Sequence, residues 1–348
     1  MSKLDIVQVG LLCDQDEGWL GLPKDAMEVL AGELPPPKTR VLLIDYMSTD
    51  VGDQGRPLLY PPIYRQIHVY DPIKNTDEVL LKMIPSSFMP GRISGMSATA
   101  LNDNRILICS NHVQEVGVVP YALIVDPFST ASTARTAPYI FLDSDDCREF
   151  ACRTWASLIT LIDGRVMRIG GYKGDLAPGD AALFDPATLK WSLVEGAPMM
   201  ATGAFSILLE NGRVLITGGM LNNLDISSAC WLYDPSSNVF TATGSLNTAR
   251  QRHAGCFLKN GNILVCGGAT ANQIYMFAAE EYNIASGKWT KINTPYRSCL
   301  DPHCTLLPDG RISIIEHNGT CSFYDPSNRK TPSRIMKMSY PCVVVAIL

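Results

Sequence analysis

The chain carries histidine, arginine, tyrosine, lysine and tryptophan residues just before or just after short apolar runs. Four of them have side chains that suit general acid–base catalysis, namely His253, His303, Tyr172 and Lys173. Eight others can bind an apolar or aromatic ligand that carries oxygen atoms, namely Arg92, His112, Trp155, Met220, Arg252, Gln273, Arg297 and His317. This set predicts catalysis without a cofactor, by orienting the substrate and donating hydrogen bonds to a developing oxyanion.

Some of these side chains also have a structural interpretation. His253 and Trp155 can pack inside the fold, and His112 and His317 can be solvated loop histidines. Tyr172 follows a glycine doublet and, with Lys173, can form an acid–base pair. Which interpretation holds depends on the elements that position these residues.

These elements are repeated units of about 50 residues, a period typical of propeller and solenoid repeats. Turn glycines recur at spacings of 48, 49 and 49 residues, at Gly164, Gly212, Gly261 and Gly310. Glycine doublets keep the same phase, at Gly170-Gly171, Gly218-Gly219 and Gly267-Gly268. Asp-Gly or Asn-Gly between apolar runs predicts a two-residue hairpin in which both central residues have positive φ. The doublets predict a close approach of two backbones.

Each unit therefore predicts a four-stranded antiparallel blade, and blades that bury their faces against one another close into a β-propeller. We expect an all-β fold of six blades, with a seventh, split blade as the alternative. We also expect one domain over residues 1–348, in which 39–348 form the blades and 1–38 are irregular. Residues 6–12 read as a strand and 22–34 as a short helix.

The ring is predicted to close through its C-terminal strand. The first blade lacks its own first strand, and the C-terminal run 342–348 is a surplus one. Pairing of 342–348 with 39–46 removes two open sheet edges. Residues 143–150 are predicted to be an acidic connecting loop. The recurring Arg92, Arg153 and Arg250 favour a structural arginine that bonds to blade carbonyls.

The composition and net charge limit the classes of partner that we expect. A net charge of −5 and a pI near 5.6 argue against nucleic acid and anionic membranes. Neither a membrane-spanning run nor a signal peptide is recognisable, so a cytoplasmic location is expected. The eleven cysteines are read as free thiols, and no cysteine–histidine spacing predicts a metal site. We expect no cofactor, and the sequence leaves the oligomeric state open.

The units "HAGCFLKNGNILVCGG" and "GAFSILLENGRVLITGG" resemble kelch repeats, and "LPDGR" with "YDP" resembles the galactose-oxidase branch of that superfamily. The resemblance covers roughly residues 39–348. It implies copper chemistry only if the oxidase ligands are present. Here no Tyr-His dipeptide occurs, and His303 follows Pro302 instead of a tyrosine. We therefore expect no copper site.

Two functions fit this resemblance. The first is a cofactor-independent cyclase, pericyclase or isomerase acting on a small molecule in the central pocket. The chain resembles, in architecture alone, the metal-free fungal propellers that catalyse hetero-Diels–Alder cyclisations. The second is a stand-alone protein-interaction scaffold, the commonest kelch use. We favour the enzyme, because no effector domain accompanies the predicted blades. A deep apolar cavity with converging polar groups in the central channel would indicate the enzyme. A shallow polar face would indicate the scaffold.

Overall fold

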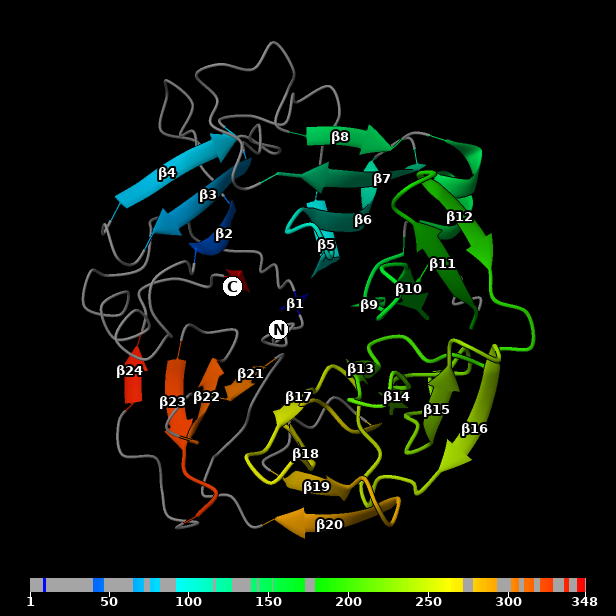
Figure 1. Cartoon of the computed structure of the whole chain (residues 1–348), viewed down its shortest axis with the longest axis vertical. Coiled ribbons are helices and arrows are strands. Elements are labelled where there is room, and N and C mark those ends of the chain that lie inside the picture. Colours follow the sequence, from blue (N-terminus) through cyan, green and yellow to red (C-terminus); the bar gives the residue numbers. More distant parts are fainter. Residues whose placement is uncertain are drawn as a thin grey trace.

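The chain folds into antiparallel sheets arranged around a central axis (Figure 1). The computed structural model describes residues 9–10, 40–46, 65–71, 76–81, 92–114, 117–126, 139–142, 144–151, 153–172, 179–271, 278–292, 302–306, 310–315, 320–327, 335–337 and 343–347. The predicted all-β propeller is confirmed. Within these residues no helix is long and apolar enough to cross a bilayer.

Three sheets contain the most regular repeats. The first of them is formed by β9 (Ser157–Thr160), β10 (Val166–Ile169), β11 (Ala181–Asp185) and β12 (Lys190–Leu193). The second is formed by β13 (Phe205–Leu208), β14 (Val214–Thr217), β15 (Cys230–Asp234) and β16 (Val239–Thr243). The third is formed by β17 (Ala254–Phe257), β18 (Ile263–Cys266), β19 (Ala279–Asn283) and β20 (Lys288–Ile292).

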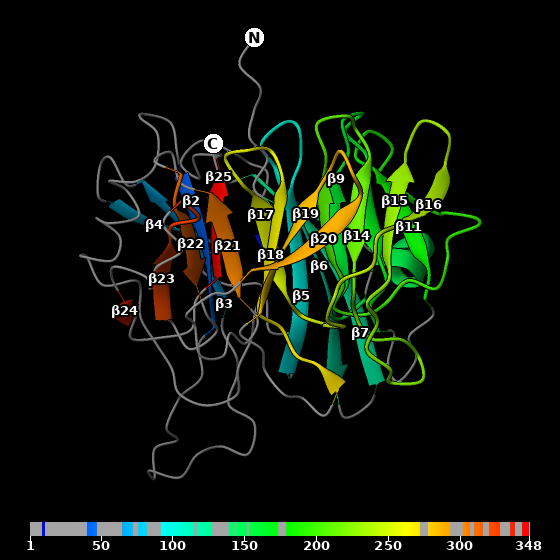
Figure 2. The same ribbon diagram turned by 90° about the horizontal axis from the view of Figure 1, so that it is seen from below.

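Three further sheets complete the described strands. One contains β21 (His303–Leu306), β22 (Ile312–Ile315), β23 (Thr320–Tyr324) and β24 (Ile335–Lys337). Another contains β1 (Val9–Gly10), β5 (Arg92–Ala100), β6 (Ile106–Gln114), β7 (Gly117–Val125) and β8 (Tyr139–Leu142). The last contains β25 (Val343–Ile347), β2 (Arg40–Tyr46), β3 (Arg65–Asp71) and β4 (Thr76–Leu81). In each sheet the strand named first lies nearest the axis, and the strand named last forms the rim (Figures 1 and 2).

The predicted pairing of the C-terminal strand with residues 39–46 is confirmed. β25 pairs antiparallel with β2, with Val345 opposite Leu42. β1 pairs with β5, with Val9 opposite Ala98, so this N-terminal strand extends an existing sheet. The helix expected over 22–34 lies outside the described residues.

The hairpin turns differ from the expectation in one detail. Gly164 has φ +89°, but Asp163 before it is not among the described residues with positive φ. Gly164 N donates to Leu161 O at 3.0 Å, and Arg165 N donates to the Asp163 carboxylate at 3.0 Å. The aspartate stabilises the turn through its side chain, and only the glycine adopts the left-handed conformation. Such a longer hairpin loop ends in a left-handed glycine and replaces the expected two-residue turn.

The core lies between neighbouring sheets. Ile159 of β9 and Val214 of β14, for example, share one buried cluster. Within a sheet, the third and fourth strands contribute an aromatic pair. Trp191 lies 5.1 Å from Phe184, measured between ring centres. The equivalent pairs are Tyr233 with Phe240 and Tyr282 with Trp289. Each such pair adds about 0.5–1.5 kcal/mol to the burial of its rings, which explains the recurring aromatic residue of the repeat.

The expected loop over 143–150 is wrong, because it contains the short helix η1 (Cys147–Ala151). Cys147 and Ala151 are fully buried in the cluster between the β5–β8 and β9–β12 sheets. Asp146, just before the helix, accepts a hydrogen bond from Trp191 N at 2.6 Å. Cys147 and Ala151 are small apolar residues four positions apart, so both lie on one face of the helix. Their burial favours the helix over the acidic loop that was expected.

Candidate functional site

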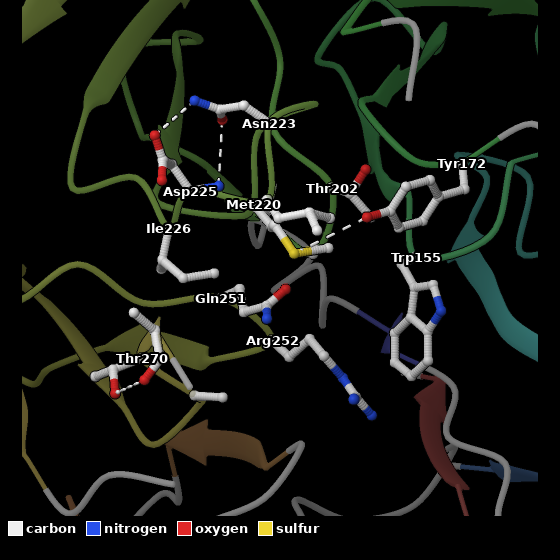
Figure 3. Close-up of a pocket in the computed structure, with 14 residues that line it drawn as sticks. Trp155, Tyr172, Thr202, Met220, Asn223, Asp225, Ile226, Gln251, Arg252 and Thr270 are labelled. Atoms are coloured by element: carbon white, nitrogen blue, oxygen red, sulfur yellow. Dashed lines mark hydrogen bonds between the residues drawn. The ribbon is translucent and has the colours of Figure 1, made fainter. Parts of the chain in front are cut away.

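A pocket of about 640 Å³ opens where the loops of three successive sheets meet (Figure 3). Its lining residues are Trp155, Tyr172, Thr202, Gly203, Met220, Asn223, Leu224, Asp225, Ile226, Gln251, Arg252, Ala269, Thr270 and Ala271. Four of them, Trp155, Tyr172, Met220 and Arg252, belong to the predicted site. The lining mixes apolar, amide and charged side chains.

Three repeated backbone bridges build the pocket walls. In each sheet, a residue before the first strand pairs with a residue after the second strand. The pairs are Thr154 with Tyr172, Thr202 with Met220, and Gln251 with Ala269. Each pair exchanges two N–H···O bonds of 2.7–3.0 Å. The second-strand loops and the segments leading into the first strands therefore gather on one face.

One equivalent position, directly after the first residue of each bridge, adopts the left-handed conformation. The three residues are Trp155, Gly203 and Arg252, with φ of +60°, +67° and +55°. They join the sheets, because Gly203 N donates to Trp155 O at 2.9 Å and Arg252 N donates to Gly203 O at 2.7 Å. Left-handed backbone at a non-glycine residue costs roughly 1–3 kcal/mol. Trp155 and Arg252 therefore keep a conformation for which glycine is the easier choice.

Their side chains meet across the missing side chain of Gly203. The guanidinium carbon of Arg252 lies 3.7 Å from the centre of the Trp155 ring. A Cβ at Gly203 would come within 3.0 Å of Arg252 Cγ. The glycine thus leaves room for the cation–π contact, which fixes a positive charge at the pocket mouth.

A short loop over 221–226 forms the exposed rim of the pocket. Leu221 N donates to Asp225 O, and Leu224 N donates to Leu221 O, both at 2.9 Å. The Asn223 amide donates to the Asp225 carboxylate at 2.5 Å. Leu224 itself has φ +67° and an exposed fraction of 69%. The loop is therefore held by its own hydrogen bonds while it presents a leucine to solvent.

Tyr172 points its phenol toward the neighbouring sheet. Its hydroxyl donates to Met220 Sδ at 3.9 Å. Burial raises the pKa of Tyr172 above its ordinary value of 10.0 and so favours the protonated phenol. Its expected acid–base partner Lys173 lies outside the described residues.

The two histidines expected to be catalytic are not among the lining residues. His253 is buried, and its Nε2 lies 2.8 Å from the Thr217 hydroxyl. Burial and the nearby Arg250 charge hold its pKa well below 6.5. Burial also lowers the pKa of His303, at the start of β21, to about 4. Both imidazoles are neutral at pH 7.

The structural interpretation of the arginines is confirmed for Arg250. Its fully buried guanidinium bonds to Gly267 O at 3.2 Å and to Glu280 Oε1 at 2.7 Å. Arg153 is also buried and lies 3.5 Å from Asp180. Both arginines therefore form ion pairs inside the fold.

The other predicted binding residues are not brought to the pocket by any described contact. Arg92 lies opposite Val113, and His112 of β6 lies opposite Val119 of β7. Three more fall outside the described residues, namely Gln273, Arg297 and His317. Several lining residues were not anticipated, namely Asn223, Leu224, Asp225, Ile226 and Gln251. Gln251 directly precedes Arg252 and bridges Ala269, so the repeat phase could have revealed it. Among the described residues, no group of three His, Cys, Asp or Glu is placed to hold a metal ion.

Comparison with known proteins points to kelch-like proteins. Kelch-like protein 24 of Rattus norvegicus, Homo sapiens and Mus musculus is 26% identical over 115 residues. Kelch-like protein 24a of Danio rerio is 26% identical over 100 residues. The first match covers 33% of this chain and 18% of the relative, so the chain spans less than a fifth of the relatives it matches. No family model matches the chain. The repeats, the ring of sheets and this similarity together fit the kelch-type β-propeller superfamily.

Proposed function

We propose that the chain is a protein-interaction propeller that binds a partner protein at the pocket mouth. The observation that carries the proposal is Leu224, an exposed leucine held on a hydrogen-bonded loop at the pocket rim. Burying such a side chain against a partner gains about 1.5–3 kcal/mol. The similarity to kelch-like proteins supports the same function.

The lining suits a peptide segment of a partner. Trp155 and Leu224 offer apolar contact, and rigid aromatic side chains are typical of interface hot spots. Asn223 and Gln251 can bond to the main chain of a bound segment, and Arg252 supplies a positive charge. Asp225 balances that charge on the opposite wall, so the mouth is polar without one dominant sign.

A photo-cross-linking residue at the rim tests the proposal. Leu224→p-benzoylphenylalanine should capture a partner that the same replacement at Ile162 does not. Ile162 is a matched control, because it is 64% exposed and lies beyond the opposite end of β9. With the captured partner purified, Leu224→Ser should weaken binding at least ten-fold, and Ile162→Ser less than two-fold. Equal capture at both positions, or an unchanged affinity in Leu224→Ser, contradicts the proposal.

The enzyme interpretation expects a deep apolar cavity, and the observed lining is mixed and bordered by an exposed leucine. None of the comparisons supports a cyclase or isomerase. The volume near 640 Å³ does fall in the range of small-molecule sites. Thermal-shift screening with terpenoid, aromatic and sugar compounds separates the two functions, because a stabilising small molecule that competes with the partner favours a ligand site.

We also infer a six-bladed ring within one domain over 1–348, with 39–348 forming the blades. The six sheets found among the described residues support this number. The pairing of β1 with β5 argues against a separate seventh sheet built from the N-terminal strand. A crystal structure with a seventh sheet overturns the inference.

A further inference from the structure

Two cysteines of neighbouring sheets lie in direct contact. The sulfur atoms of Cys266 and Cys304 are 3.0 Å apart. Cys266 is the last residue of β18, and Cys304 is the second residue of β21. The two sheets are packed together through β17 and β21. A disulfide has an S–S distance of about 2.05 Å, so an approach of roughly 1 Å separates this pair from a covalent bond.

The two thiols differ in exposure in a way that suits stepwise oxidation. Cys304 is partly exposed, whereas Cys266 has an exposed fraction of 5%. Cys109, Cys147, Cys230 and Cys256, the other cysteines whose burial the structure describes, are buried. An oxidant from solvent therefore reaches Cys304 first, with Cys266 in place as the resolving thiol.

We propose that Cys266 and Cys304 form a reversible disulfide that joins two adjacent blades when the protein meets a hydroperoxide. The Cys304 thiolate attacks the peroxide, its O–O bond breaks, and Cys304 becomes a sulfenic acid. The Cys266 thiolate then attacks that sulfur and displaces hydroxide, which takes up the released proton as water. In total, two thiols and one hydrogen peroxide give one disulfide and two waters. A dithiol reductant reverses the reaction by exchange.

The cross-link would stabilise the wall of the pocket. Cys266 is followed by Gly267, Gly268 and the lining residue Ala269, so the bond ties the start of this wall to the next sheet. It also closes a chain segment between residues 38 positions apart. Such a closure restricts the unfolded chain and stabilises the fold. This inference does not depend on the partner-binding proposal.

A neighbouring cysteine provides an internal control. Cys256 shares the buried cluster of Cys266, but burial raises its pKa above the ordinary 9.0. Burial likewise raises the pKa of Cys230 to about 12. Thiols of this kind are poor nucleophiles at neutral pH, so Cys256 is the matched internal control.

Peptide mapping of the oxidised full-length protein tests the proposal. The reduced protein is treated with one to five equivalents of hydrogen peroxide, the remaining thiols are alkylated in denaturant, and the unreduced peptides are identified by mass spectrometry. Cleavage before Asp301 is needed, because it separates Cys304 from Cys299. We expect one cross-linked peptide pair containing Cys266 and Cys304. We also expect a rise in Tm of roughly 5 °C that dithiothreitol removes.

Variants provide the controls. Cys304→Ser and Cys266→Ser should each abolish the cross-link and the Tm shift, and Cys256→Ser should retain both. The wild-type peptide map decides the question even if a variant fails to fold. A disulfide through Cys256 or Cys299 overturns the proposal, and so does oxidation of Cys304 to the sulfinic acid without any cross-link.

Discussion

The guanidinium of Arg252 stacks on the indole of Trp155 across an intervening blade, 3.7 Å from the ring centre. Both residues occupy the same place in the repeat and share its left-handed backbone, with Gly203 between them. The stack therefore results from three equivalent positions that carry an aromatic ring, no side chain and a cation. A contact of this kind stabilises by about 0.5–2 kcal/mol, depending on its desolvation.

A double-mutant cycle measures this contact. Trp155→Leu and Arg252→Met should each destabilise the fold, and the double variant should lose about 1 kcal/mol less than their sum, because the second change finds no partner left. Urea unfolding monitored by circular dichroism gives the free energies. Trp155→Leu combined with Arg165→Met is the control pair, since Arg165 pairs with Asp163 at a hairpin turn and should be additive. Additivity of the Trp155 and Arg252 changes would contradict the stack.

Gly203→Ala should cost more than a change at another left-handed glycine. At Gly203 the new Cβ would meet Arg252 Cγ at 3.0 Å and Arg252 N at 3.3 Å. Gly196 has a similar φ of +70° and no atom within 4 Å, so Gly196→Ala reports backbone strain alone. We expect about 1 kcal/mol for Gly196→Ala and about twice that for Gly203→Ala. Equal losses in urea unfolding would show that Arg252 moves aside without cost.

Breaking the buried ion pair should be strongly destabilising. Arg250 and Glu280 are fully buried and 2.7 Å apart, so Arg250→Met leaves a buried carboxylate without its cation. We expect a loss of about 3–5 kcal/mol in the free energy of unfolding. Arg165→Ala removes an exposed ion pair and should cost at most about 1 kcal/mol. A loss below 1 kcal/mol in Arg250→Met would mean that the pair is not held as described.

Stability should fall as the pH drops from 7 to 5. The pKa of His303 is about 4 in the folded chain and 6.5 when unfolded, so the unfolded state binds more protons below pH 6.5. The stability contributed by the neutral imidazole is present above pH 6.5 and is lost as the pH falls toward 4. His303 should account for a loss of about 1–2 kcal/mol between pH 7 and pH 5. His303→Asn should make the free energy of unfolding less dependent on pH. His253 contributes the same pH dependence to the wild type and to this variant. Parallel curves in urea titrations would refute this assignment.

Much of the fold follows from short-range signals in the sequence. Gly218 and Gly219 were expected to allow a close backbone approach, and Gly219 N indeed donates to Arg250 O at 2.8 Å. The pairing of 342–348 with 39–46 followed from counting strands. The helix at Cys147 was missed, because only its burial against a neighbouring sheet favours it over a loop.

The pocket was only partly predictable. Trp155, Tyr172, Met220 and Arg252 were found because the repeat places their positions at the ends of strands. The rim around Leu224 was missed, since its turn depends on hydrogen bonds between Asn223 and Asp225, which no repeated feature of the sequence indicates. The positions of His253 and His303 depend on packing between sheets, which residue type alone does not reveal.

The pairing of β25 with β2 has a consequence for biosynthesis. The ribosome makes β2 among the first strands and β25 some 300 residues later, so the nascent chain carries an unsatisfied sheet margin throughout translation of the intervening blades. Such a margin can template pairing with another chain. Productive folding thus competes with aggregation until β25 emerges from the ribosome. A chain that terminates before β25 would leave the edge of β2 unpaired.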